Sequence, residues 1–165
     1  MAATKAKPRT TAFSSQQISS FLSKYDPRIA AAARASRAKL RKMVPGGTEF
    51  VYDNYNALVF GYGPSDRPSE AVLSLAIMPR WVTLCFLKGA RLRDPKHLLG
   101  GGGNIVRNIH LSSPRHLEED DVRDLIDQAL AAAQPEFSGE PGKQQTIIKS
   151  ISARQRPRRP RAQKS

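Results

Sequence analysis

Cysteine is nearly absent from this sequence, since Cys85 is the one cysteine in 165 residues. A single cysteine forms no internal disulfide. No apolar run approaches the about 20 residues that span a bilayer. The opening segment MAATKAKPRTTAF is charged and lacks the apolar stretch of a secretory signal. Together these absences predict a cytoplasmic protein that has no membrane partner.

Motifs of several enzyme classes are also missing. The sequence has no GxSxG turn, no HExxH motif and no CxxC pair, and its histidines are His97, His110 and His116. A dyad of Cys85 and His110 on neighbouring strands is the one nucleophile–base pairing to consider, and an inert cysteine is the interpretation we favour. No motif indicates a cofactor, and the sequence favours a protein that is not an enzyme.

Acidic residues are absent from both ends of the chain. Residues 1–11 carry Lys5, Lys7 and Arg9, and residues 143–165 carry eight Lys/Arg. These ends account for most of the formal net charge of +13, so the middle of the chain is nearly neutral. The high charge therefore describes the tails rather than the surface of the folded part.

This pattern divides the chain into three parts. We predict a disordered basic N-terminal tail over residues 1–12, a folded domain over 13–134, and a linker with a disordered basic tail over 135–165. Within the last part, residues 146–152 (TIIKSIS) are either a short strand added at an edge or a docking segment.

The C-terminal tail contains the candidates for contact with nucleic acid. Basic, proline-spaced segments attract phosphate backbones non-specifically. The alternatives are a solubilising tail and an arm that docks on its own domain or on a partner. The candidate residues are Arg154, Arg156, Arg158, Arg159 and Arg161.

Helical spacing of apolar residues occurs in three places. Residues 15–25 form the first helix, and a second begins at Asp26-Pro27, a cap followed by a favourable first residue, and ends at VPGG, residues 44–47. The third helix follows Ser112 or Ser113 and ends before Pro135. Its first turns are rich in acids, as the helix dipole favours.

Alternation with a period of two predicts strands between the second and third helices. The segments are 50–53, 57–62, 71–78 and 81–87, with a tight hairpin at Pro79-Arg80 and a further strand over 105–111. Leu73, Leu75, Ile77, Val82, Leu84 and Phe86 are expected to face the helices.

Four consecutive glycines precede the last of these strands. Lys96–Leu99 reads as one short helical turn after Asp94-Pro95, and we expect Gly100 to end it in the left-handed conformation. A phosphate cradle needs a helix after the glycines, whereas NIVRNIHL is strand-like. We therefore favour a flexible turn that enters a strand. A loop that closes over a ligand is the alternative.

Four segments, in this order, resemble a known family. They are KYDPRIAAAARASRAKLRKMVPGGTEFVYDNYNALVFGYGP, MPRWVTLCFLKGA, DPKHLLGGGGNIVRNI and SISARQRPRR. They are similar to the YdhG-like domain family, a bacterial group of mostly unknown function, over roughly residues 18–160. The resemblance implies an α+β fold, a two-layer α/β sandwich in which helices cover one face of an antiparallel sheet of four or five strands, frataxin-like in outline.

The resemblance also bears on function. Some distant relatives are associated with intracellular iron handling, which implies an iron or metal role as an alternative. Asn108 stands where the family's pattern usually has a histidine, so a mechanism that needs an imidazole there is disfavoured. The resemblance names no substrate.

A polar, aromatic run suggests the mouth of a ligand pocket. The run YDNYN offers side-chain hydrogen bonds, although the same residues also suit a turn packed by tyrosines. Concave sites combine an apolar wall with a few polar groups, and side chains from the later strands could line the same exposed sheet face. The ligand candidates are Tyr52, Asp53, Tyr55, Asn56, Trp81, Lys88, Arg107 and His110.

Carboxylates in the third helix are weak candidates for a metal site. Asp120, Asp124 and Asp127 fall on one helical face, and hard cations prefer oxygen ligands. The dipole alone also favours acids there, and no sharp loop completes a coordination shell. The densely basic second helix counts against direct transfer of an iron role.

The sequence therefore leads to two hypotheses of different classes. The first is a non-catalytic domain that binds a small molecule or a metal. The second is a nucleic-acid-associated protein that acts through its basic tails. A homodimer formed through a sheet edge or the basic helix is left open.

Overall fold

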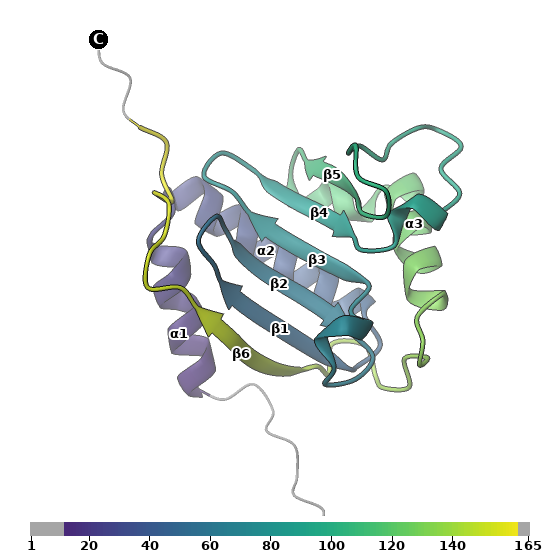
Figure 1. The fold of residues 1–165 in the computed structure, drawn as a ribbon, viewed down its shortest axis with the longest axis horizontal. Helices are drawn as coiled ribbons and strands as arrows, with labels where there is room; N and C mark the ends of the chain where they lie inside the picture. The colour runs from purple at the N-terminus through teal and green to yellow at the C-terminus, as the bar shows by residue number, and fades with distance from the viewer. Residues whose placement is uncertain (1–11, 162–165) are drawn as a thin grey trace, which may run out of the picture.

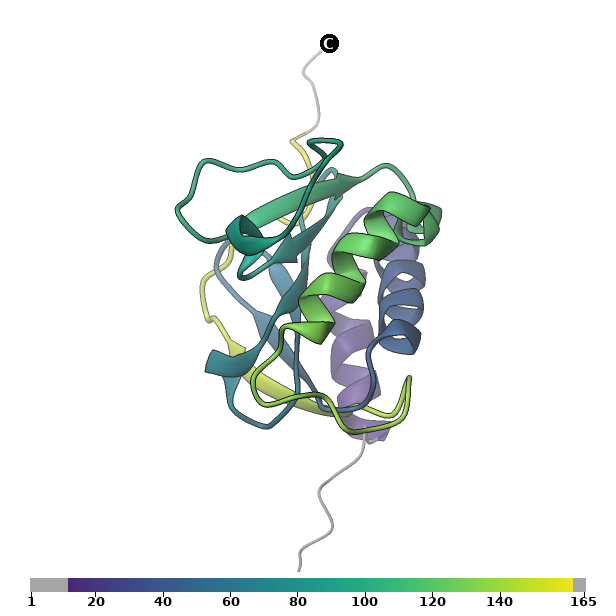
Figure 2. The ribbon, with the colours of Figure 1, turned by 90° about the vertical axis from the view of Figure 1, so that its right-hand side faces the viewer.

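The computed structural model describes residues 12–161 as one mixed sheet with helices on one face (Figures 1 and 2). The predicted N-terminal tail lies outside the described residues, except for Ala12. The helices are α1 (Ala12–Ser23), α2 (Pro27–Met43) and α3 (Asp120–Ala131). The strands are β1 (Thr48–Asp53), β2 (Leu58–Gly63), β3 (Leu73–Ile77), β4 (Val82–Phe86), β5 (Arg107–Leu111) and β6 (Gln145–Ile151). None of the described helices is long and apolar enough to cross a membrane.

The sheet has six strands in the order β5-β4-β3-β2-β1-β6. Strands β1 to β5 pair in antiparallel fashion, through short turns after β1 and β3 and longer loops after β2 and β4, whereas β6 pairs parallel to β1. The predicted sheet of four or five antiparallel strands is therefore wrong in number and in type. The segment TIIKSI returns after α3 through a long connection, which brings it beside β1 in the parallel direction.

The helices are amphipathic in the way the sequence indicates. Asp26 caps α2 by accepting a hydrogen bond from the backbone N–H of Arg28 at 2.9 Å, and Pro27 occupies the first turn. The sheet residues expected to face the helices are all buried in one core; they are Leu73, Leu75, Ile77, Val82, Leu84 and Phe86. The view in Figure 2 shows the three helices together on one side of the sheet. None of the three α-helices of the described residues covers the other face of the sheet.

Tyr25, at the end of α1, fastens the helical layer to the centre of the sheet. Its hydroxyl donates to the carbonyl of Ile77 at 2.7 Å and accepts from the N–H of Leu58 at 3.0 Å. Burial raises the pKa of Tyr25, so the hydroxyl keeps its proton at neutral pH. A buried hydroxyl without partners destabilises a fold. These two hydrogen bonds therefore fix the position of the end of α1 on the sheet.

The glycine segment is a loop that enters a strand, as we favoured. Gly100 exchanges two backbone hydrogen bonds with Asn108 of β5, at 2.8 and 2.9 Å. The short helical turn predicted at Lys96–Leu99 is wrong: the segment is an irregular turn. Asp94 caps it with both carboxylate oxygens, and the left-handed residues are His97 and Gly101 rather than Gly100.

The C-terminal segment differs most from expectation. Residues 154–161 were predicted to be disordered by composition, but they lie against the domain beyond β6, and Arg158 is only 4% exposed. The reason is a buried acceptor: Arg158 donates to Asp53 at 3.0 Å. Folded structure therefore continues past residue 134, through β6, to the last residues described.

Candidate functional site

The predicted ligand residues do not meet at one site. Tyr52 on β1 and His110 on β5 both belong to the open face of the sheet, but three strands lie between their own. At about 4.8 Å per strand spacing, the two strands are roughly 19 Å apart. On that face Trp81 stacks on His110, with ring centroids 5.0 Å apart. The exposed face thus carries a local aromatic pair rather than the single polar pocket that we expected.

The remaining predicted residues are scattered. Asp53 has the same orientation as Val51 and is buried on the helical side of the sheet. Tyr55 and Asn56 are exposed in the turn between β1 and β2. Arg107 donates to the backbone carbonyl of Val106 at 2.9 Å and to that of Gly103, so it ties down the glycine loop.

Lys88, by contrast, lines a hollow that the sequence did not reveal. The hollow has a volume of about 450 Å³ and lies where the start of β3 and the end of β4 meet the last turn of α3. Its floor is apolar, because Val72, Phe86 and Ala129 are buried there and Leu92 is partly buried. We call it the apolar hollow. Its size and its lining are typical of small-molecule sites.

An amide clamp holds the two walls of the apolar hollow together. Gln128 of α3 accepts a hydrogen bond from the N–H of Arg93 at 2.9 Å and donates to the carbonyl of Arg93 at 3.0 Å. Gln128 also donates to Asp124 at 2.9 Å, which fixes the amide orientation. The loop after β4 is therefore anchored to α3, and the hollow is preformed.

The rim of the apolar hollow is basic. Lys88, Arg91 and Arg93 line it, and no acidic residue does. Arg93 also borders a small crevice that includes Asp121 and Asp124. Lys88 and Arg91 are exposed and form no ion pair within residues 12–161. These two cations are thus available to an anionic group whose apolar body occupies the floor.

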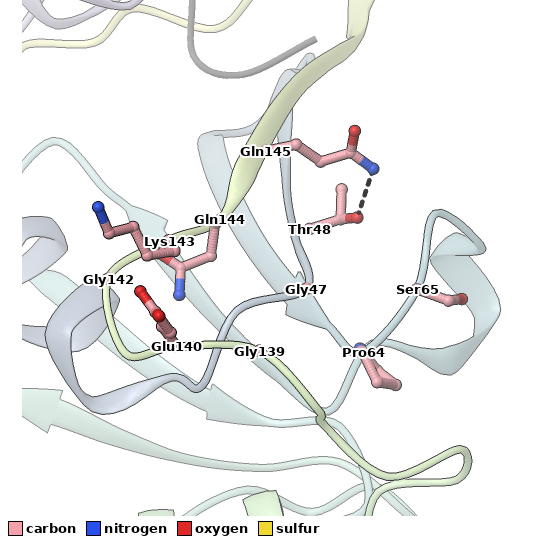
Figure 3. Close-up of a pocket in the computed structure, with 10 residues that line it drawn as sticks. All are labelled: Gly47, Thr48, Pro64, Ser65, Gly139, Glu140, Gly142, Lys143, Gln144 and Gln145. Carbon is pink, nitrogen blue, oxygen red and sulfur yellow. Dashed lines mark hydrogen bonds between the residues drawn. The ribbon is translucent and has the colours of Figure 1, made fainter. Parts of the chain in front are cut away.

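A second, polar hollow of about 710 Å³ lies at the start of β1 (Figure 3). Apart from Pro64, its lining consists of glycines and polar residues, including Glu140 and Lys143 of opposite charge. Gln144 anchors it: the side-chain amide donates to the carbonyls of Val44 at 2.7 Å and Arg41 at 3.1 Å, at the end of α2. Because no large, buried apolar side chain lines this hollow, it offers a ligand less desolvation energy than the apolar hollow does.

Glu49, which the sequence did not single out, forms a buried ionic centre under α2. The carboxylate accepts hydrogen bonds from Arg37 at 2.6 and 2.9 Å and from Arg41 at 2.6 Å. Tyr62 at 2.8 Å and Thr146 at 2.9 Å complete the set of donors. Burial acts to raise the pKa of Glu49, but the bonds and charges of the two arginines outweigh it, and the pKa is lowered.

Asp53 forms a comparable centre at the other end of β1. Lys24 donates to it at 2.6 Å and Arg158 at 3.0 Å, and its side chain is fully buried. Burial acts to raise the pKa of Asp53, but hydrogen bonds from Lys24, Gln155 and Arg158 outweigh it, and the pKa is lowered. This residue therefore joins α1, β1 and the C-terminal segment, and a role as a catalytic base is not indicated.

Because of these two buried carboxylates, the free energy of unfolding is expected to decrease at acidic pH. Both carboxyls have a folded pKa below the unfolded values of about 4.3 for Glu and 3.9 for Asp. Their stabilisation is therefore complete above the unfolded pKa and is lost as the pH falls through the folded pKa. We expect the free energy of unfolding, measured with urea, to be level from neutral pH to about pH 5 and to fall below about pH 4.5. The Glu49→Gln variant should show a shallower fall, and an equally steep one would contradict this assignment.

The weak metal candidates do not form a cluster. Within the described part of the chain, no three His, Cys, Asp or Glu side chains are arranged to hold one metal ion. Asp124 accepts from Gln128 instead, and Asp120 and Asp127 are exposed on α3. Cys85 faces Asn108 across the strand pair, and burial raises the pKa of its thiol. A thiolate nucleophile paired with His110 is therefore not indicated.

The arginines predicted to contact nucleic acid fall into two groups. Arg158 is buried as the partner of Asp53. The other four are exposed along the docked segment; they are Arg154, Arg156, Arg159 and Arg161. No protein-family model, curated protein or solved structure matches the chain.

Proposed function

We propose that this protein is a non-catalytic domain that binds a small amphipathic anion, a molecule with an apolar body and one carboxylate, sulfonate or phosphate group. The observation that carries the proposal is the apolar hollow, whose buried floor lies beside the unpaired cations Lys88 and Arg91. Burial of apolar surface supplies the affinity, and the two cations select the charge.

Cations at this place also have a purely structural explanation, since positive charge near the last turn of a helix stabilises it through the dipole. The two explanations differ in what they predict. Helix stabilisation predicts a small change in unfolding free energy and no effect on ligands. Ligand selection predicts a loss of affinity that depends on the ligand's charge.

The test uses two fluorescent probes of similar shape: anilinonaphthalene sulfonate, which is an anion, and phenylnaphthylamine, which is uncharged. Replacement of Lys88 and Arg91 by glutamine should weaken binding of the anion about tenfold and leave the neutral probe unchanged. A control variant with Arg67→Gln and Arg80→Gln loses the same charge at exposed positions outside the hollow. Fluorescence titration at fixed salt measures the affinity of the parent and of both variants for each probe.

A blocking variant locates the site. Ala132 is exposed at the rim of the apolar hollow. The Ala132→Phe variant should therefore bind both probes more weakly, while its unfolding transition stays cooperative. Equal weakening of the anion in the control variant, or unchanged affinities in Ala132→Phe, would show that the probes bind elsewhere and would overturn the proposal.

A further inference from the structure

The segment 152–161, which we call the arm, is fixed to the turn between β1 and β2. The N–H of Ser152 donates to the carbonyl of Asp53 and the N–H of Arg156 donates to that of Tyr55, both at 2.8 Å. Gln155 donates to the carbonyl of Asp53 at 3.0 Å. Arg158 inserts beneath these contacts, and its guanidinium lies 5.8 Å from the centre of the Tyr25 ring. The arm is therefore part of the folded surface.

This docking concentrates positive charge without neutralising it. Arg154, Arg156, Arg159 and Arg161 are exposed, and none of them forms an ion pair within residues 12–161. The carboxylate of Asp53, to which the arm is anchored, already pairs with Lys24 and Arg158. Pro157 and Pro160 restrict the backbone between the arginines. Holding like charges close together is unfavourable in itself, so the arrangement is suited to a polyanion.

An exposed aromatic ring accompanies the arginines. Tyr55 is 49% exposed, and the guanidinium of Arg156 lies 5.7 Å from the centre of its ring. Bases of single strands stack on such rings, while arginines follow the backbone phosphates. The combination therefore favours nucleic acid.

We propose that the docked arm, together with Tyr55, is a binding surface for single-stranded nucleic acid. The surface is separate from the apolar hollow, because no residue of the arm lines that hollow. The proposal therefore stands or falls independently of small-anion binding.

The test is a fluorescence anisotropy titration of the full chain with labelled oligothymidine at several salt concentrations. The variant Arg154→Gln/Arg156→Gln/Arg161→Gln should bind at least about tenfold more weakly near physiological salt. Its slope of log K against log salt should be smaller by about 2, since each single-strand phosphate contact contributes about 0.7. The matched variant Arg67→Gln/Arg80→Gln/Arg115→Gln loses the same charge at exposed positions elsewhere and should stay within about twofold of the parent.

Two further comparisons test the docked geometry and the ring. Arg158→Gln and Arg154→Gln remove one charge each, but only the first removes the buried anchor, so the first should lose more affinity. Tyr55→Leu should weaken binding about fivefold or more through lost stacking. Equal losses in the two triple variants would mean attraction by bulk charge. Any one of three results would overturn the proposal: these equal losses, no binding of the oligonucleotide by the parent chain, or binding to anionic phosphatidylserine vesicles and not to the oligonucleotide.

Discussion

Replacement of Glu49 by leucine is expected to lower the free energy of unfolding by about 3–5 kcal/mol, because removing one partner of a buried ion pair leaves the remaining charges buried without a partner. Arg37 and Arg41 would lose their shared carboxylate, and the hydroxyl of Tyr62 would lose its acceptor inside the protein. Burial and the neighbouring Glu49 raise the pKa of Tyr62 well above its ordinary value. That hydroxyl therefore remains a donor that needs an acceptor.

Urea unfolding followed by circular dichroism measures this effect. The matched control is Glu118→Leu, because Glu118 pairs with Lys39 at 2.7 Å but its side chain is 51% exposed. Water and salt screen exposed ion pairs, which therefore contribute little to stability, so the control should differ little from the parent. Similar changes in the two variants would show that Glu49 does not hold α2 to the sheet.

Replacement of Asp53 by leucine is the second large effect, with an expected loss of about 3–4 kcal/mol, since Arg158 would remain buried without its charge partner. The guanidinium of Arg158 can reach solvent only if the arm detaches from the domain. We therefore expect faster amide hydrogen exchange at Ser152 and Arg156, whose N–H groups bond to the turn after β1. Exchange should stay slow in β3 and β4.

Asp66→Leu provides the control for Asp53, because Asp66 is exposed in the loop after β2. Exchange along the arm should be unchanged in that variant. Should Asp53→Leu leave exchange at Ser152 and Arg156 as slow as in the parent, the arm would be held by something other than this ion pair.

The sequence predicted the local elements well, because periodicity is a local property. The first two helices and the first four strands lie close to their expected positions, and the alternation of β3 and β4 identified their buried residues. The third helix starts later than expected, at Asp120, because a separate 3-10 turn over Pro114–Glu118 follows Ser113. The alternation of β1 contained a further signal that the sequence-based prediction did not use. Glu49 and Asp53 share the orientation of Val51 on β1, so a buried Val51 implies two buried carboxylates that need cationic partners.

The remaining features depend on contacts between distant segments, which composition does not encode. The C-terminal arginines have a disordered composition, yet the segment docks through a buried ion pair with Asp53, over a hundred residues earlier, and through hydrogen bonds to Asp53 and Tyr55. The apolar hollow likewise combines Val72, the turn after β4 and the end of α3. Each of these segments has an ordinary local pattern, so neither periodicity nor a motif could have predicted the site.

Contacts between the bound anionic probe and methyl groups of the protein test the central claim most directly. In a nuclear Overhauser experiment on the complex with anilinonaphthalene sulfonate, the account predicts cross-peaks from the naphthalene ring to the methyls of Val72, Leu92 and Ala129. Cross-peaks confined to methyls outside the apolar hollow, such as those of Ile147 or Ile151, would contradict it.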